Sequence, residues 1–352
     1  MNLTHTKHKE IPSLDGWRAV AITIVFLSHA GLGKIVPGGL GVTIFFFLSG
    51  YLITTLLLKE YADSGAINIR HFYIRRVLRL TPPLLLTLVI AYSLTYLGVF
   101  RGDASWTGFF AQLFYFANYY SLFFDPGHTI PTGTGVFWSL AVEEHFYFVF
   151  PALFLFLLHK ADRKKLPFYL LLICVAVLLW RIYLVQSPSF STNRTYYATD
   201  TRIDSILFGC ILATLQLKDD WLLRLRQPAV RITAVSLGVL LLLLTLVVRS
   251  ESFRETFRYS LQGIALMPLF FYSVNNPESF PFKILNLKLI RKIGIYSYSI
   301  YLSHELLLEN ADWASHFAIL NILIALALSL VFAMLVDRFI DTHLRKWRAR
   351  FR

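Results

Sequence analysis

The sequence predicts an all-α protein, a polytopic bundle of transmembrane helices. Of its 352 residues, 56% are hydrophobic and only 16% are charged, whereas soluble domains usually carry about 25% charged residues. Apolar runs long enough to cross a bilayer recur to the end of the chain. No Ser/Gly-rich linker or repeat divides these runs, so we expect a single integral membrane domain over residues 1–352.

Eleven apolar segments are candidates for spans. The polar stretch 1–14 precedes them and does not resemble a cleavable signal, so we expect it to be a cytoplasmic arm. Residues 341–352 are basic, and we expect a cytoplasmic tail that lies at anionic headgroups. The candidate segments are 15–33, 40–58, 82–100, 106–124, 135–158, 166–186, 202–217, 232–249, 259–275, 292–310 and 317–340.

The distribution of the 34 lysine and arginine residues predicts the topology. Most lie in 59–81, 160–165, 218–231, 276–292 and the tail, and the loops between these hold few. The positive-inside rule places the loops rich in lysine and arginine on one side of the membrane and the loops poor in them on the other. This arrangement is possible only if one segment between 100 and 135 does not cross the membrane.

Residues 106–124 are the best candidate for that segment, because they are rich in aromatic residues and interrupted by Asn118. We expect them to be re-entrant or peripheral, which leaves about ten spans with both termini in the cytoplasm. Topology then accounts for the net charge of +13, and no nucleic-acid partner is expected. Cys174 and Cys210 lie in apolar runs and are interpreted as small buried hydrophobes. No metal-ligand spacing occurs, so no metal is expected.

The first apolar segment, "RAVAITIVFLSHAG", carries Arg18 and His29. Eleven residues correspond to about three helical turns, so both side chains share one face roughly 16 Å apart. Lipid satisfies neither group, so both should face the interior of the bundle. The alternative is a snorkelling arginine and a histidine that only hydrogen-bonds a neighbouring helix.

Three later segments also carry ionisable or polar residues. Taken singly, each could be an interhelical hydrogen bond that holds the bundle together. Intramembrane ionisable groups on several helices favour a substrate path or a reaction site. These residues are Glu143, Glu144 and His145 in one segment, Asp204 in a second, and Ser297, Tyr301 and His304 in a third.

The stretch "IRHFYIRRVLRLTPP" places Arg75, Arg76 and Arg79 on one helical turn. Arg76 and Arg79 are three residues apart, so both can face one anion, and guanidinium groups suit phosphate. Ordinary positive-inside flanking is the alternative. Ser49 and Gly50 lie in the middle of another segment, where glycine permits close approach of a neighbour or ligand.

Six stretches occur in the order typical of acyltransferase family 3, and the chain resembles that family over nearly its whole length. The stretches are "SLDGWRAVAITIVFLSHAG", "FFFLSGYLITTLL", "FYIRRVLRLTP", "FWSLAVEEHFYFVFP", "RIDSILFGCILA" and "SYSIYLSHELL". The resemblance implies a bacterial inner-membrane enzyme that O-acylates surface glycans or small molecules. The SGNH hydrolase-like domain that is frequent at the carboxy terminus in this family is not seen in the sequence, so we expect a stand-alone form.

The family's signature residues can be carried over to this sequence. Its Arg/Lys-x₁₀-His motif matches Arg18 and His29, and its Arg-x-x-Arg motif matches Arg76 and Arg79. Its acidic position matches Glu143, whereas the residue after Glu144, commonly glutamine in the family, is His145 here.

The resemblance implies acyl transfer from cytoplasmic acyl-CoA, with acetyl-CoA as the expected donor. Arg76 and Arg79, with Arg75, would hold the phosphates of the donor, and Arg18 would lie deeper on the same path. His29 would act as general base on an acceptor hydroxyl or carry the acyl group itself.

Glu143 would orient His29, and further polar residues would contact the substrate. The acceptor would be a glycan, a lipid-linked sugar or a small hydroxylated molecule at the outer side, and membrane lipids would surround the protein. The substrate-contacting set is Asp204, Ser297, Tyr301, His304 and Ser49.

Two other classes of protein fit the same residues. A multi-span transporter or exporter would also have an internal polar track, although the paired halves common in transporters are not visible here. A scaffold subunit would use its polar residues for packing alone.

Overall fold

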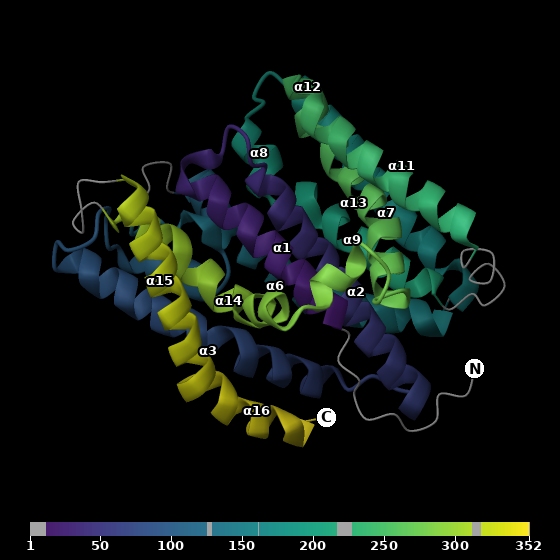
Figure 1. The fold of residues 1–352 in the computed structure, drawn as a ribbon, viewed down its shortest axis with the longest axis horizontal. Helices are drawn as coiled ribbons and strands as arrows, with labels where there is room; N and C mark the ends of the chain where they lie inside the picture. Colours follow the sequence, from purple (N-terminus) through teal and green to yellow (C-terminus); the bar gives the residue numbers. More distant parts are fainter. Residues whose placement is uncertain (1–11, 125–128, 161, 217–226, 312–317, 352) are drawn as a thin grey trace.

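The computed structural model describes residues 12–124, 129–160, 162–216, 227–311 and 318–351, and these residues are mainly helical (Figure 1). The described part has no strand beyond an isolated bridge between Gly102 and Pro131. It contains ten helices of 16 or more residues, which confirms the all-α prediction. They are α1 (Pro12–Leu27), α2 (Gly38–Ser64), α3 (Ile69–Tyr96), α6 (Trp138–Lys160), α7 (Leu166–Gln186), α9 (Thr199–Leu215), α11 (Pro228–Val247), α13 (Phe257–Asn275), α14 (Lys288–Glu309) and α15 (Ala318–Val336).

Six helical segments in the described residues are long and apolar enough to cross a membrane. This agrees with a polytopic protein, while the full number of crossings and the side of each terminus stay predictions. The six segments are Gly38–Ser64, Ile69–Tyr96, Gly135–Lys160, Arg163–Gln186, Pro228–Val247 and Ala318–Phe351.

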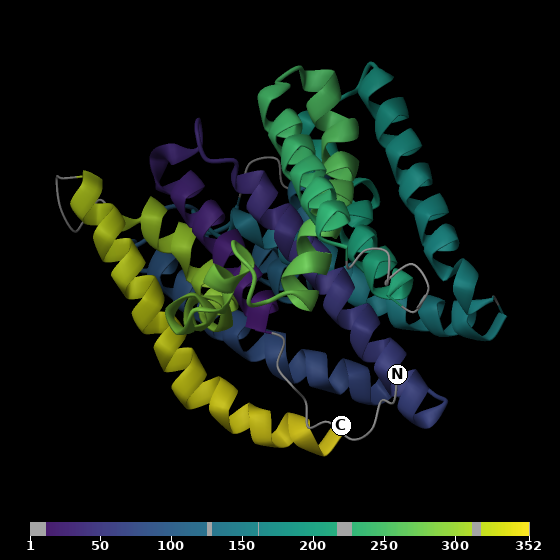
Figure 2. The ribbon, with the colours of Figure 1, turned by 45° about the vertical axis from the view of Figure 1, so that its right-hand side comes forward.

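Helix α1 lies at the centre of the arrangement. It packs against α2 on one side and α14 on the other, and α15 covers α14 (Figure 2). A second group, α7, α9, α11 and α13, joins the first mainly through the contact between α9 and α2. The short helices α8 (Thr192–Tyr197) and α12 (Glu251–Glu255) precede α9 and α13 in the chain.

Glycines permit the close crossing of α2 and α9. A Cβ atom added at Gly50 would collide with the carbonyl group of Ile206, and one added at Gly209 would collide with the carbonyl of Phe47. Each helix therefore contributes a glycine at the point where the other's backbone passes. This contact fixes the position of Ser49, the residue before Gly50.

Helix α3 begins well before its apolar run. The sequence predicted a span over 82–100, and the helix starts at Ile69, after Asn68 has capped it by accepting a hydrogen bond from the amide of His71 at 2.9 Å. It also continues through Pro82 and Pro83. The charged segment and the span thus form one rod, which holds the predicted arginine cluster rigidly against the bundle.

The segment 106–124 is broken into short pieces, in agreement with the prediction that it does not form a continuous span. The pieces are α4 (Trp106–Leu113), α5 (Ala117–Tyr119) and a π-helical turn over Tyr120–Phe124. Eight residues of helix are only about 12 Å long, too short for a bilayer. Buried polar groups tie the segment to the protein: Gln112 donates to Thr134 Oγ1 at 2.8 Å, and Asn118 donates to Thr199 Oγ1 at 3.0 Å.

The basic segment after α15 is folded, although we expected only a tail. A π-helical turn (Asp337–Asp341) leads into α16 (Thr342–Arg348) and a 3₁₀ turn (Ala349–Phe351), and α16 packs against α3. The expected arm, residues 1–14, lies almost wholly outside the described residues, since only Pro12 and its successors are described.

Candidate active site

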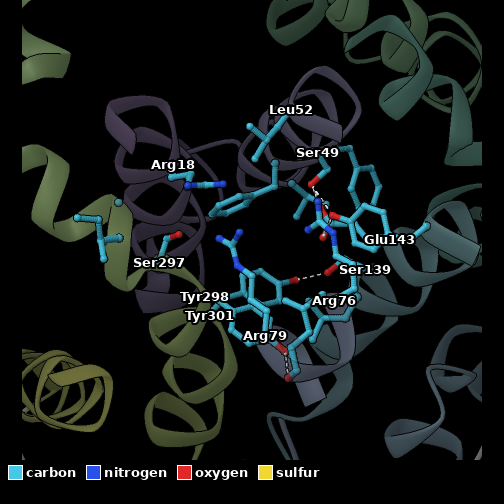
Figure 3. A pocket seen from close by; sticks show the side chains of 18 residues that line it. Arg18, Ser49, Leu52, Arg76, Arg79, Ser139, Glu143, Ser297, Tyr298 and Tyr301 are labelled. Carbon is cyan, nitrogen blue, oxygen red and sulfur yellow. Dashed lines mark hydrogen bonds between the residues drawn. The ribbon is translucent and has the colours of Figure 1, made fainter. Parts of the chain in front are cut away.

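A cavity of about 100 Å³ lies between α1, α2, α3, α6 and α14. Seven of the residues that the sequence singled out line it, which brings together groups from five helices (Figure 3). These seven are Arg18, Ser49, Arg76, Arg79, Glu143, Ser297 and Tyr301. Tyr147, Tyr298 and Ser139 also line the cavity and were not among the predicted site residues.

Three arginines make one end of the cavity cationic. Arg18 donates to Asp15 at 2.9 Å, and the guanidinium of Arg76 lies 4.6 Å from the ring centroid of Tyr147. Arg79 is close enough to Arg18 and Arg76 for their charges to repel. Arg18 comes from α1 and the other two from α3, and all three lie in the N-terminal halves of their helices. A phosphate or another anion would be stabilised there.

Glu143 is a fixed acceptor across the cavity from Arg18 (Figure 3). Ser49 Oγ donates to Glu143 Oε1 at 2.9 Å, and the hydroxyl of Tyr147 lies 2.9 Å from Ser49 Oγ and 3.2 Å from Glu143 Oε2. Tyr147 is four residues after Glu143 on α6, so the two share a helix face. That spacing was the signal in the sequence that could have identified Tyr147.

Two hydroxyl groups meet farther along the cavity. Tyr301 and Ser139 are 2.6 Å apart, and Tyr301 also donates to the carbonyl oxygen of Val136 at 3.0 Å. Tyr298, one turn away, donates to the carbonyl oxygen of Leu80 at 2.7 Å. That bond ties α14 to α3 just before Pro82 and Pro83, which have no amide hydrogen to donate within the helix.

His29 lies beyond Tyr301, in the π-helical turn Ser28–Leu32 that follows α1, and it does not line the cavity. Its Nδ1 atom is 3.1 Å from His304 Nε2, and the two rings stack with centroids 5.2 Å apart. The ring of Tyr301 lies 5.4 Å from that of His304. Tyr301 therefore contacts both the cavity and the histidine pair.

The hydrogen bonds assign the tautomers of the two histidines. His304 Nδ1 is 2.8 Å from the carbonyl oxygen of Tyr301. A carbonyl oxygen only accepts, so His304 Nδ1 carries the proton and, in the neutral ring, Nε2 is an acceptor. His29 Nδ1 must then donate to it, which leaves His29 Nε2 as the unprotonated nitrogen. The side chain of His29 is 29% exposed.

The expected pairing of Glu143 with His29 is wrong. Glu143 is held by Ser49 and Tyr147, and the carboxylate beside His29 is Glu305, whose Oε1 lies 3.6 Å from His29 Nδ1. The residue adjacent to His304 on α14 thus places a carboxyl group beside His29. The stretch "SYSIYLSHELL" contains Glu305. The sequence alone does not show which way this side chain points, because that depends on how α14 is rotated about its own axis.

Two other predicted site residues lie outside the cavity. Asp204 is completely buried in an ion pair with Arg181, with N–O distances of 2.8 and 2.7 Å, and it accepts a further bond from Ser260 at 2.7 Å. This is the interhelical bond that the sequence left open as an alternative. Arg75 donates to Glu60 Oε2 at 3.3 Å and to the carbonyl oxygen of Phe351, facing the C-terminal segment instead of the cavity.

His145 is also accounted for by local packing. Its Nδ1 atom is 2.7 Å from Thr199 Oγ1, and its ring stacks on Tyr119 with centroids 5.8 Å apart. It therefore joins α6 to the segment 106–124 and to α9. Cys174 and Cys210 are free thiols in buried positions, as predicted.

The chain is similar to known acyltransferases. A model of the acyltransferase domain, Acyl_transf_3, matches residues 11–338. The peptidoglycan O-acetyltransferase OatA of Listeria monocytogenes is 31% identical, with 97% of this chain and 57% of the relative covered. A putative O-acetyltransferase of Staphylococcus aureus is 32% identical over 97% of this chain and 59% of the relative.

The putative peptidoglycan O-acetyltransferase YrhL of Bacillus subtilis is 32% identical over 84% of this chain and 48% of the relative. The chain thus spans about half to three fifths of the length of these relatives. No solved structure matches it. The family model covers nearly the whole chain, so the chain belongs to acyltransferase family 3.

Proposed function

We propose that this protein is a membrane-bound O-acetyltransferase. It would take an acetyl group from acetyl-CoA at the cytoplasmic side and transfer it to a hydroxyl of a glycan at the outer side of the membrane. The glycan class is suggested by the relatives named as peptidoglycan O-acetyltransferases. The acyl-CoA donor and the orientation are part of the proposal.

One observation carries this proposal: a guanidinium-lined cavity ends at Tyr301, and Tyr301 contacts the His304–His29 pair. A donor with phosphate groups would bind through Arg76 and Arg79, with Arg18 beside them. The thioester at the other end of such a donor would then lie deeper in the bundle, toward Ser139 and Tyr301.

His29 Nε2 is the group that fits general base catalysis. It would accept the proton of the acceptor hydroxyl while the hydroxyl oxygen attacks the acetyl carbonyl carbon, and the thiolate of CoA would leave. His304 accepts from His29 Nδ1 and Glu305 lies beside it, so the cation formed on His29 is stabilised. Positioned acid–base groups typically contribute about 10²–10⁴-fold to the rate. The same nitrogen could alternatively carry the acetyl group.

The proposal is tested by mass spectrometry of envelope glycans from cells that express the wild type, His29→Ala or no copy of the chain. We expect acetyl esters with the wild type and their loss in the other two. Purified His29→Ala should still bind CoA, whereas Arg76→Ala and Arg79→Ala should weaken that binding. Unchanged glycans in all three strains would contradict the proposal. Counterflow of a glycan acceptor into proteoliposomes without acyl-CoA would favour a transporter.

A further inference from the structure

The segment that follows α15 presents one face to the bundle. This segment comprises α16 and its flanking turns; from Asp341 onward its partly buried residues are Asp341, Leu344, Arg348 and Phe351, and the other residues from 342 to 350 are exposed. Spacings of three and four place these four on one side of a helix. Arg348 is thus the basic residue of this segment that turns inward, whereas Arg345, Lys346 and Arg350 face outward.

Helix α3 holds this segment at the turn that carries the arginines of the cavity. Arg75 donates to the carbonyl oxygen of Phe351, and the ring of His71 lies 5.5 Å from the ring of Phe351. Arg76 and Arg79 follow on the same helix. Figures 1 and 2 both show α16 alongside α3. Phe351 is therefore anchored beside the turn of α3 that carries Arg76 and Arg79.

Arg348 extends the cationic cluster beyond the cavity wall. The guanidinium group of Arg348 is close enough to that of Arg79 for the two positive charges to repel. Arg18 and Arg76 repel Arg79 in the same way. Asp341 is near both Arg79 and Arg348 and offsets part of this charge. Arg348 is not among the residues that line the cavity. Gathering four guanidinium groups raises the electrostatic energy, and a ligand with several negative charges would lower it.

The geometry points to a donor-binding role for Arg348: we propose that it binds the 3′-phosphate at the nucleotide end of the CoA donor. This inference rests on the proposed function. CoA carries a diphosphate between its pantetheine arm and its nucleotide, and a separate phosphate on the ribose. Arg76 and Arg79 line the cavity that the arm would enter, so they meet the diphosphate. Arg348 is near Arg79 but does not line the cavity, so it would meet the more distant phosphate.

Calorimetric titration of the full-length protein in detergent tests this assignment with two probes, CoA and 3′-dephospho-CoA. We expect the wild type to bind CoA about tenfold more tightly, the scale of one charge-assisted contact. Arg348→Ala should lose about tenfold in affinity for CoA and bind 3′-dephospho-CoA as the wild type does. Arg350→Ala, on the exposed side of the same segment, is the matched control and should behave as the wild type with both probes.

Equal binding of CoA by Arg348→Ala and the wild type would overturn the inference, as would an equal loss for both probes. Should the alanine variant not fold, Arg348→Gln gives the same readout. If the wild type binds neither probe, the proposed function fails instead. The same titration in nanodiscs of zwitterionic or of anionic phospholipid shows whether the phosphate that Arg348 binds belongs to a lipid headgroup or to CoA. An Arg348→Ala effect that depends on the anionic lipid and leaves CoA binding unchanged would also overturn the inference.

Discussion

At the scale of single residues, the direction of each hydrogen bond in the His29 network decides which atom can react. The carbonyl oxygen of Tyr301 fixes the proton of His304, and His304 fixes the proton of His29. Only His29 Nε2 remains as a base. Glu305 makes no direct contact with the expected reacting atom, so we expect it to position His29 and to stabilise its cationic form.

Glu305→Gln tests this positioning role. Glutamine keeps the size of the side chain but removes the charge that stabilises a protonated His29, so we expect kcat to fall by about 10–100-fold, the size of a lost charge interaction of 1.4–2.8 kcal/mol. The KM for acetyl-CoA should stay the same, because the arginines of the cavity are untouched. Glu309→Gln, one turn later and exposed, is the control. A wild-type kcat for Glu305→Gln would contradict the assignment.

The pair of Asp204 and Arg181 is expected to serve stability alone. Asp204→Asn leaves a buried guanidinium without its counter-charge, and removing one partner of a buried pair typically costs about 3–5 kcal/mol. Thermal unfolding in detergent should show a lower melting temperature, while the activity of the folded fraction per molecule stays near that of the wild type. Asp200→Asn, whose pair with Arg194 is partly exposed, should cost less. If the Asp204→Asn variant is as stable as the wild type but loses activity, the original prediction that Asp204 contacts the substrate would be supported.

Residue spacing in the sequence predicted contacts within a helix better than contacts between helices. Arg76 and Arg79 line the cavity together, as their spacing of three indicated, and Glu143 faces the cavity with them. The partner of His29 depends on how α14 is rotated against α1, and no local pattern contains that rotation. The same reason explains why Arg181, in an otherwise apolar run, was not recognised as the partner of Asp204.

At the scale of helices, apolar runs located the helices but not all of their ends. Hydropathy placed the start of the third span at residue 82, yet α3 begins at Ile69 because a charged, well-capped segment is also a good helix. The reverse holds for 106–124, which is apolar but breaks into pieces. There Tyr115 has a φ of 58°, a conformation that ends a regular helix.

The crossing of α2 and α9 makes a prediction at this scale. Gly209→Ala places a methyl group against the backbone of Phe47, so the helices must separate. We expect a loss of about 1–3 kcal/mol in stability, the usual range for overpacking. Activity should fall as well, because Ser49 moves away from Glu143. Gly135→Ala is the control, since no atom lies within 4 Å of the added Cβ. Equal melting temperatures for the two variants would show that α2 and α9 do not depend on this contact.

At the scale of the whole molecule, the two chemical parts of the site lie toward opposite ends of α1. Arg18 is in the first half of the helix and His29 follows its end, so the two residues are separated along α1, as the sequence predicted. Transfer from one side of a membrane to the other requires this separation. The positive-inside pattern of the loops places the arginine end in the cytoplasm, and this orientation is still a prediction.

Thiol labelling in vesicles of known orientation tests that orientation. Ile295 lines the cavity at its arginine end and is 53% exposed, whereas Ile35, in the loop after His29, is 83% exposed. An impermeant maleimide should label Ile295→Cys only from the cytoplasmic side and Ile35→Cys only from the outer side. The native Cys174 and Cys210 are buried, so background labelling should be low. CoA should protect Ile295→Cys and leave Ile35→Cys reactive. Labelling of both cysteines from the same side would exclude a transfer path that crosses the membrane along α1.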